Sequence, residues 1–324
     1  MLFAEITFPG WNPVAIHLGP LAIRWYGIGY LVGFIVASLL LDRMVKDGFL
    51  PLTKAAVSDL IGWLVAGVLL GGRLGYAIFY DPRMLINPVE LVKLWEGGLS
   101  FHGGLAGVFI ASVWFARRRR VSWGRVADGL ALAAPPGIFV VRIANFLNGE
   151  LFGRVAPSWV PWAMRFPTDP AAQALSPELA RAGPLNWHDA YAALRADGGW
   201  AQIAPHVPLR HPSQLYEATL EGLVIFVVLW WIYLKRKGRL GAGKLGAAFL
   251  LLYAAARFLI EFTRQPDPQF VNAAHPLGTV LGPLSMGQIL SLLLAVFGII
   301  LLLKRDTAGE RGPREGLVSG GSGE

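Results

Sequence analysis

The stretch LALAAPPGIFVVRIANFLNGELFGR, residues 130–154, joins an apolar run directly to a run of charged and amide side chains. Its first half is apolar enough for the hydrocarbon of a bilayer, whereas its second half holds two arginines, two asparagines and a glutamate. An arginine at the bilayer centre costs roughly 2.5–3.5 kcal/mol on insertion scales, so such residues usually face a bundle interior. The stretch therefore predicts a membrane helix with one polar, functional face.

The whole chain has the composition of an integral membrane protein. Its 324 residues have a mean hydropathy of +0.50 and are 54% hydrophobic and 15% charged, whereas soluble domains are about 25% charged. Long apolar blocks exclude a soluble enzyme. The chain has no cysteine, so a disulfide, a thiolate nucleophile and a cysteine-based metal site are excluded as well.

Seven segments are long and apolar enough to cross a membrane as helices. They lie near residues 20–42, 57–79, 99–116, 126–148, 213–234, 245–263 and 285–303. We therefore predict an all-α integral membrane protein with seven transmembrane helices in a catalytic domain over residues 1–305. A small extracytoplasmic head, residues 150–212, is expected between the fourth and fifth helices, because this stretch is long, polar and rich in Pro and Trp. Residues 306–324 are expected to form a disordered cytoplasmic tail.

Basic residues predict the orientation of these helices. They gather in the loops after the first, third and fifth spans and in the C-terminal tail, and the opposite short loops hold few. This alternation favours an outside N-terminus and a cytoplasmic C-terminus. The run Arg117–Arg120 is then a cytoplasmic anchor between two spans, and no nucleic-acid partner is predicted.

Helical spacing gathers polar residues within the predicted spans. Arg142, Asn145 and Asn148 share one face of the fourth span, and Tyr253, Arg257 and Glu261 form a stripe on the sixth. Further arginines inside predicted spans are Arg24 and Arg73, and His102 lies at the outer end of the third span. Together these groups predict a basic pocket toward the extracytoplasmic leaflet, suited to a phosphate-bearing lipid.

A purely structural interpretation remains open for several of these residues. Arg257 and Glu261 could form a simple ion pair within one helix, and Glu217 could pair with an arginine of a neighbouring helix. The asparagines could act as interhelical hydrogen-bonding groups. Gly67, Gly71 and Gly75 have the small-xxx-small spacing of close helix packing.

Several blocks resemble one bacterial family. VRIANFLNGELFGR is similar to the signature of the prolipoprotein diacylglyceryl transferases, and AIRWYGIGYLVGF, GGRLGY, WEGGLSFHGGLAG, RHPSQLYEATLEG and AARFLIEFTRQPDPQF resemble family blocks in the same order. The resemblance implies a multi-pass enzyme of the bacterial cytoplasmic (inner) membrane, surrounded by membrane lipids. It would move the diacylglyceryl group of phosphatidylglycerol to the lipobox cysteine of a preprolipoprotein signal peptide, forming a thioether and releasing glycerol-1-phosphate. It implies no metal and no organic cofactor.

The resemblance also implies roles for individual residues. Arg142 and Arg257 would be catalytic and hold the phosphate, and His102 is the best candidate for the general base, since an imidazole titrates near neutral pH. The residues implied in substrate binding are Tyr26, Arg73, Asn145, Asn148, Glu150, Gly153, Arg154, Tyr253 and Glu261. Among these, Gly153 would allow a tight backbone, and Glu150 would order the arginines or bind the glycerol hydroxyls.

Two other classes of function compete with this one. A membrane transporter could use the same arginine-lined cavity to pass an anionic or lipid-like solute, and chemical turnover against net flux would distinguish the two. A non-catalytic scaffold would not need so many charges inside the membrane.

Overall fold

The structure is a computed structural model that describes residues 6–18, 21–93, 98–237, 239–266, 270–271, 275 and 277–304. The chain divides into two compact units. The first contains Met1–Gly33, Ala134–Val228 and Phe249–Ile299, and the second contains Phe34–Ala133, Leu229–Ala248 and the chain from Ile300. The predicted disordered tail, residues 306–324, lies outside the described residues.

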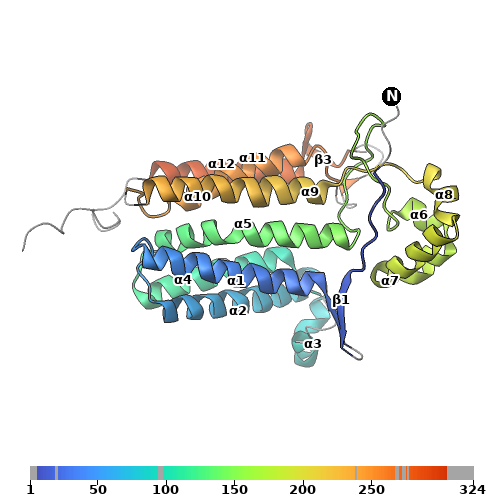
Figure 1. Ribbon diagram of the computed structural model, residues 1–324. Helices are drawn as coiled ribbons and strands as arrows, with labels where there is room; N and C mark the ends of the chain where they lie inside the picture. Colours follow the sequence, from blue (N-terminus) through green and yellow to red (C-terminus); the bar gives the residue numbers. More distant parts are fainter. Residues whose placement is uncertain are drawn as a thin grey trace, which may run out of the picture. The chain divides into compact units, whose positions relative to one another are not determined.

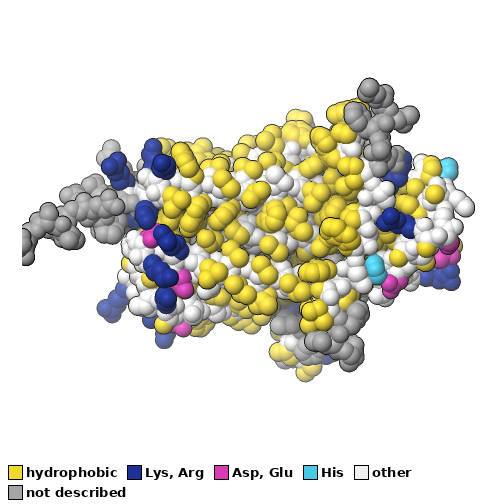
Figure 2. Space-filling view, viewed as in Figure 1, with side chains coloured by type: hydrophobic (Ala, Val, Ile, Leu, Met, Phe, Trp, Pro, Cys, Tyr) yellow, Lys and Arg dark blue, Asp and Glu magenta, His cyan; other side chains and the backbone are white. Residues whose placement is uncertain are grey.

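Among the described residues, five helices are long and apolar enough to cross a membrane. They are α1 (Trp25–Lys46), α2 (Lys54–Phe79), α5 (Trp123–Leu147), the continuous run Ser213–Arg236, and α12 (Met286–Leu303). Hydrophobic side chains cover the flanks of the long helices (Figure 2). These features confirm a mostly helical, multi-pass membrane protein.

Two further helices occupy the remaining predicted spans. α4 (Phe101–Arg119) has 19 residues and ends in three arginines, and α11 (Lys244–Ile260) has 17 residues. Neither is among the five helices that are long and apolar enough by themselves, so seven crossings remain a prediction. The first predicted span begins too early, because Leu21–Arg24 form strand β2 and helix α1 starts at Trp25. Arg24 therefore lies outside the helix.

In the second unit, α2 and α4 lie side by side through glycines (Figure 1). A Cβ atom on Gly103 would overlap the carbonyl oxygen of Gly71 and lie 2.9 Å from the Cα of Gly75, and one on Gly107 would overlap the carbonyl oxygen of Gly67. Only glycine permits this approach of two backbones. The predicted packing role of Gly67, Gly71 and Gly75 is confirmed.

The same unit contains a buried cap for α11. The carboxylate of Asp128, on α5, accepts hydrogen bonds from the backbone N–H groups of Gly243 (2.9 Å) and Gly246 (3.0 Å). Gly243 directly precedes α11 and Gly246 lies in its first turn, where backbone N–H groups have no partner within the helix. Nearby, Arg125 donates to the carbonyl of Leu240 at 2.8 Å.

In the first unit, residues 150–212 fold around an aromatic core. Three helices, α6 (Pro170–Leu175), α7 (Pro177–Ala196) and α8 (Gly199–Ile203), and the 3-10 turn η3 (Ala204–His206) lie in this stretch (Figure 1). Trp187 and Tyr191 of α7 are fully buried with Phe166, and the N-terminal Phe8 packs against all three. The Tyr191 hydroxyl donates to the carbonyl of Phe8 at 3.1 Å.

Two short antiparallel hairpins complete the fold of the first unit. They pair β1 (Val14–Leu18) with β2, and β3 (Thr279–Leu281) with β4 (Leu284–Ser285). The all-α prediction missed them, because strands of two to five residues leave little periodicity in the sequence.

Candidate active site

The first unit gathers three arginines and three glutamates, which we call the arginine–glutamate cluster. Its members are Arg142 on α5, Glu217 and Glu221 on the run that contains α9 (Ser213–Glu217) and the π-helix η4 (Ala218–Val224), and Arg257, Glu261 and Arg264 on or just after α11. The shortest pairs join Arg142 Nε to Glu217 Oε2 at 2.7 Å and Arg257 to Glu261 at 3.0 Å. Both pairings foreseen in the sequence are therefore confirmed.

The carboxylates are buried more deeply than the guanidinium groups. The side chains of Glu217 and Glu221 are 1% and 0% exposed, whereas those of Arg142 and Arg257 are 23% and 17% exposed. A buried carboxylate is costly unless it is paired, so the arginines satisfy the glutamates from the more open side. The cluster has three charges of each sign, so its charges balance, whereas the sequence alone predicted a basic pocket.

Local helix geometry explains why both glutamates reach the arginines. They lie four residues apart at the start of η4, where the helix widens, and such π-helical segments occur frequently at functional sites. Gly222 allows η4 to approach α5 closely, because a Cβ atom there would lie 2.6 Å from the Cβ of Phe139. Arg142 comes from the same helix α5.

The end of α5 places Asn145, Asn148 and Glu150 together. Gly149 has a φ of +66° and ends the helix, so the chain folds back and Glu150 Oε1 accepts from Asn145 at 2.8 Å and Asn148 at 3.1 Å. Arg142 lies 3.5 Å from Asn145 Oδ1. Glu150 thus holds both asparagines, and Asn145 is in turn a hydrogen-bond partner of Arg142.

Gly153 and Arg154 contact the backbone of the segments that follow the cluster's helices. The Gly153 N–H donates to the His211 carbonyl at 2.8 Å, and a Cβ atom at Gly153 would overlap the carbonyl of Thr263. Arg154 donates from Nε to the carbonyl of Arg264 at 2.8 Å and from its terminal nitrogen to that of Leu277 at 3.1 Å. Arg154 therefore fixes the backbone that carries Arg264.

Two tyrosines predicted for the site also belong to the first unit. Tyr26, in the first turn of α1, lies 3.1 Å from Tyr30, hydroxyl to hydroxyl. Tyr253 lies one turn before Arg257 on α11, so the two residues share one helix face.

The other two predicted site residues belong to the second unit. Arg73 is buried and donates to backbone carbonyls of the 90–98 segment, including Glu90 at 2.6 Å and Gly98 at 3.0 Å. His102 lies in the first turn of α4 with an exposed side chain. Arg73 and His102 thus belong to the second unit, whereas all the remaining predicted site residues belong to the first.

The predicted site set omitted Glu217, Glu221 and Arg264. The two glutamates carried a signal, since their spacing of four residues places them on one helix face. Arg264 had no such signal in the sequence, because this residue follows a predicted span, where a loop is expected. Within the described part of the chain, no group of three or more His, Asp or Glu side chains is arranged to hold a metal ion.

Comparisons with known proteins identify the family of the chain. Residues 13–304 match the family described as prolipoprotein diacylglyceryl transferase. Similar relatives are phosphatidylglycerol--prolipoprotein diacylglyceryl transferases from Cereibacter sphaeroides (40% identical, covering 94% of this chain and 99% of the relative), Bordetella avium (42%, covering 95% and 100%) and Burkholderia multivorans (43%, covering 92% and 95%). The chain belongs to the prolipoprotein diacylglyceryl transferase family.

Proposed function

We propose that the protein transfers the diacylglyceryl group of phosphatidylglycerol to the lipobox cysteine thiol of a preprolipoprotein. The cysteine sulfur attacks a glycerol carbon, the carbon–oxygen bond to phosphate breaks, and a thioether and glycerol-1-phosphate form. The observation that carries the proposal is a cluster of partly exposed arginines, held by buried glutamates, in a chain of this family.

In this proposal Arg142 and Arg257 bind the phosphate and stabilise the charge that develops on it as the carbon–oxygen bond breaks. Donors fixed before the reaction stabilise such charge best in a water-poor site. Arg142 suits this role because, among the described residues, its short ion pair uses Nε alone, and its two terminal nitrogens lie 3.5 Å and 3.9 Å from Asn145 and Glu221. The N–H groups of these nitrogens can donate to phosphate oxygens while Nε stays on Glu217.

The remaining residues would orient the lipid. Asn145, Asn148 and Glu150 form a connected hydrogen-bonding group that suits the glycerol hydroxyls of the headgroup. Tyr26 and Tyr253 would contact the lipid or its phosphate, and Glu261 holds Arg257. Gly153 and Arg154 would shape the backbone around the site.

The attacking thiol must lose its proton, because the thiolate is the nucleophile. We assign this step to His102, whose imidazole would take the proton and later release it to the phosphate or to water. The exposed side chain of His102 at the start of α4 suits a group that meets a substrate.

The proposal includes a seven-span topology in the bacterial inner membrane. The last turns of α1, α4 and α10 (Ile225–Arg236) are basic, and Lys and Arg gather at one end of the second unit (Figure 2). This pattern favours a cytoplasmic side at these helix ends and an extracytoplasmic N-terminus. Residues 150–212 would then form the extracytoplasmic head.

A reconstituted assay tests the function. The protein is placed in liposomes of phosphatidylglycerol with a lipobox peptide that has a free cysteine, and mass spectrometry detects the products. We expect the diacylglyceryl thioether and glycerol phosphate in equal amounts, and neither when the thiol is blocked. Lipid or solute flux without either product would contradict the proposal and favour a transporter.

A further inference from the structure

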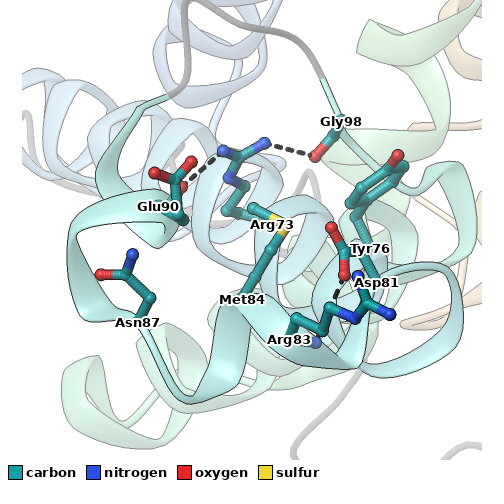
Figure 3. A pocket seen from close by; sticks show the side chains of 8 residues that line it. All are labelled: Arg73, Tyr76, Asp81, Arg83, Met84, Asn87, Glu90 and Gly98. Carbon is teal, nitrogen blue, oxygen red and sulfur yellow. Dashed lines mark hydrogen bonds between the residues drawn. The ribbon is translucent and has the colours of Figure 1, made fainter.

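The second unit has a cavity of about 440 Å³ where α2 ends and is followed by the 3-10 turn η1 (Pro82–Leu85) and helix α3 (Pro88–Val92) (Figure 3). Two arginines, two carboxylates, a phenol and an amide line it. The lining residues are Arg73, Tyr76, Asp81, Arg83, Met84, Asn87, Glu90 and Gly98. None of them belongs to the arginine–glutamate cluster.

Arg73 makes the wall of this cavity rigid. Its guanidinium donates to the carbonyls of Glu90 (2.6 Å), Leu91 (3.2 Å), Lys93 (3.0 Å) and Gly98 (3.0 Å). These bonds tie residues 90–93 and Gly98 to α2. Arg73 is therefore a positioning residue for the cavity and not a free phosphate ligand.

Arg83 and Asp81 offer charges of opposite sign to a ligand. Within the described residues, no carboxylate forms an ion pair with the exposed guanidinium of Arg83, and the carboxylate of Asp81 accepts only from the backbone N–H of Arg83. Glu90, by contrast, pairs with Lys93 at 2.7 Å. Figure 3 shows Arg83, Asp81 and Tyr76 on the same side of the cavity.

Exposed apolar side chains alternate along the chain with the polar residues that line this cavity. Ile86 is 86% exposed, Phe79 74% and Val92 66%, and Val89 is also exposed. Helix α2 itself exposes Leu70, Leu74 and Ile78 at helical spacing. Because α2 is apolar enough to cross a membrane, this surface suits acyl chains at the level where hydrocarbon meets headgroups.

We propose that the cavity binds the headgroup of a zwitterionic, amine-bearing phospholipid. Its phosphate would lie on Arg83, its ammonium near Asp81 and its acyl chains against Phe79, Ile86 and Val92. Charge-assisted hydrogen bonds to both ends select this headgroup. An anionic glycerol headgroup lacks the ammonium and leaves Asp81 without a partner. This lipid is thus different from the diacylglyceryl donor and seats the 81–93 segment in the interface.

Photocrosslinking of the full-length protein in nanodiscs tests the proposal. Two probes of equal acyl chain, a photoreactive phosphatidylethanolamine and a photoreactive phosphatidylglycerol, are compared, and labelled peptides are mapped by mass spectrometry. We expect the ethanolamine probe to label residues 81–93 more strongly. Arg83→Gln and Asp81→Asn should each lower that labelling about tenfold. The matched control is Arg181→Gln, which removes a charge from a 77% exposed arginine of the first unit.

Equal labelling of the 81–93 segment by both probes would overturn the choice of headgroup. Wild-type labelling in Arg83→Gln or in Asp81→Asn would overturn the site itself. The two variants are interpreted separately, each only after size-exclusion chromatography shows a folded protein, so that either one alone decides the outcome.

Discussion

Glu217 contacts three arginines although its side chain is only 1% exposed. Its oxygens lie 2.7 Å from Arg142, 3.7 Å from Arg257 and 3.8 Å from Arg264. A carboxylate this deep is tolerated only because the positive charges surround it. The residue therefore links α5 to α11 and fixes the arginines that are proposed to meet the phosphate.

Replacing Glu217 by alanine should destabilise the protein strongly. Breaking a buried ion pair by removing one partner typically costs about 3–5 kcal/mol, because the remaining charges stay buried. Thermal unfolding in detergent measures the effect. The control is Glu178→Ala, which removes an exposed carboxylate that pairs with the 77% exposed Arg181 and accepts from Ser176, and it should cost much less. Equal losses in the two variants would show that Glu217 does not support the cluster.

Arg142→Lys should remove transfer without removing the charge. A lysine can satisfy Glu217, but it lacks the second set of donors that would meet the phosphate. We expect turnover to fall by about 10²–10³-fold, the usual effect of losing a preorganised donor, and Arg257→Lys should behave alike. Transfer to a lipobox peptide, per folded protein, is the measurement, with Arg181→Lys as the control. Near-normal turnover would exclude the phosphate role.

His102→Gln should change how the rate depends on pH. If His102 accepts the thiol proton, the variant keeps its fold but loses most activity near neutral pH and recovers part of it in alkali, where the thiol ionises unaided. Rate–pH profiles of wild type and variant provide the test. A variant with substantial activity and the wild-type profile would show that another group takes the proton.

At the level of helices and loops, glycines decide how closely α2 and α4 approach. The spacing of Gly67, Gly71 and Gly75 predicted close packing of this helix face, because small residues one turn apart let another backbone approach. It did not predict that the partner is α4. The widened turn of η4 could not be predicted in the same way. It depends on where α5 and Phe139 meet Gly222, which is a tertiary contact.

Gly103→Ala should weaken the α2–α4 contact. The new methyl group would overlap the carbonyl of Gly71, and overpacking of this kind costs about 1–3 kcal/mol. Gly62→Ala is the matched control, because no atom lies within 4 Å of the position of its Cβ atom. We expect that control to be neutral or stabilising by up to about 1 kcal/mol, since alanine favours helices. Thermal unfolding of both variants distinguishes the two effects.

For the molecule as a whole, apolar blocks and basic loops were enough to predict a multi-pass helical membrane protein. They place each of the seven apolar spans within a few residues of a helix, because hydrophobic length is encoded locally, but they did not predict the more polar helix α7. The charge balance of the cluster could not be predicted so directly, since it requires knowing that Glu217 and Glu221 of one helix face arginines of two others. The predicted start of α1 was wrong, because Leu21–Arg24 form strand β2 of the short hairpin with β1.

The predicted orientation can be tested by cysteine labelling, because the chain has no cysteine of its own. Arg181→Cys, in the 150–212 segment, should react with a membrane-impermeant maleimide in intact inner-membrane vesicles only when they are right-side-out. Arg118→Cys, in the last turn of α4, should react only in inverted vesicles. Labelling of both residues from the same side would contradict the proposed topology.

A structure determined with phosphatidylglycerol bound would test the role of the arginine–glutamate cluster most directly. We predict that the phosphate lies within about 3 Å of guanidinium nitrogens of both Arg142 and Arg257, with Glu217 still paired to Arg142. A phosphate bound elsewhere, with both arginines turned entirely to the glutamates, would show that the cluster is a structural ion-pair network and that the lipid is activated at another place.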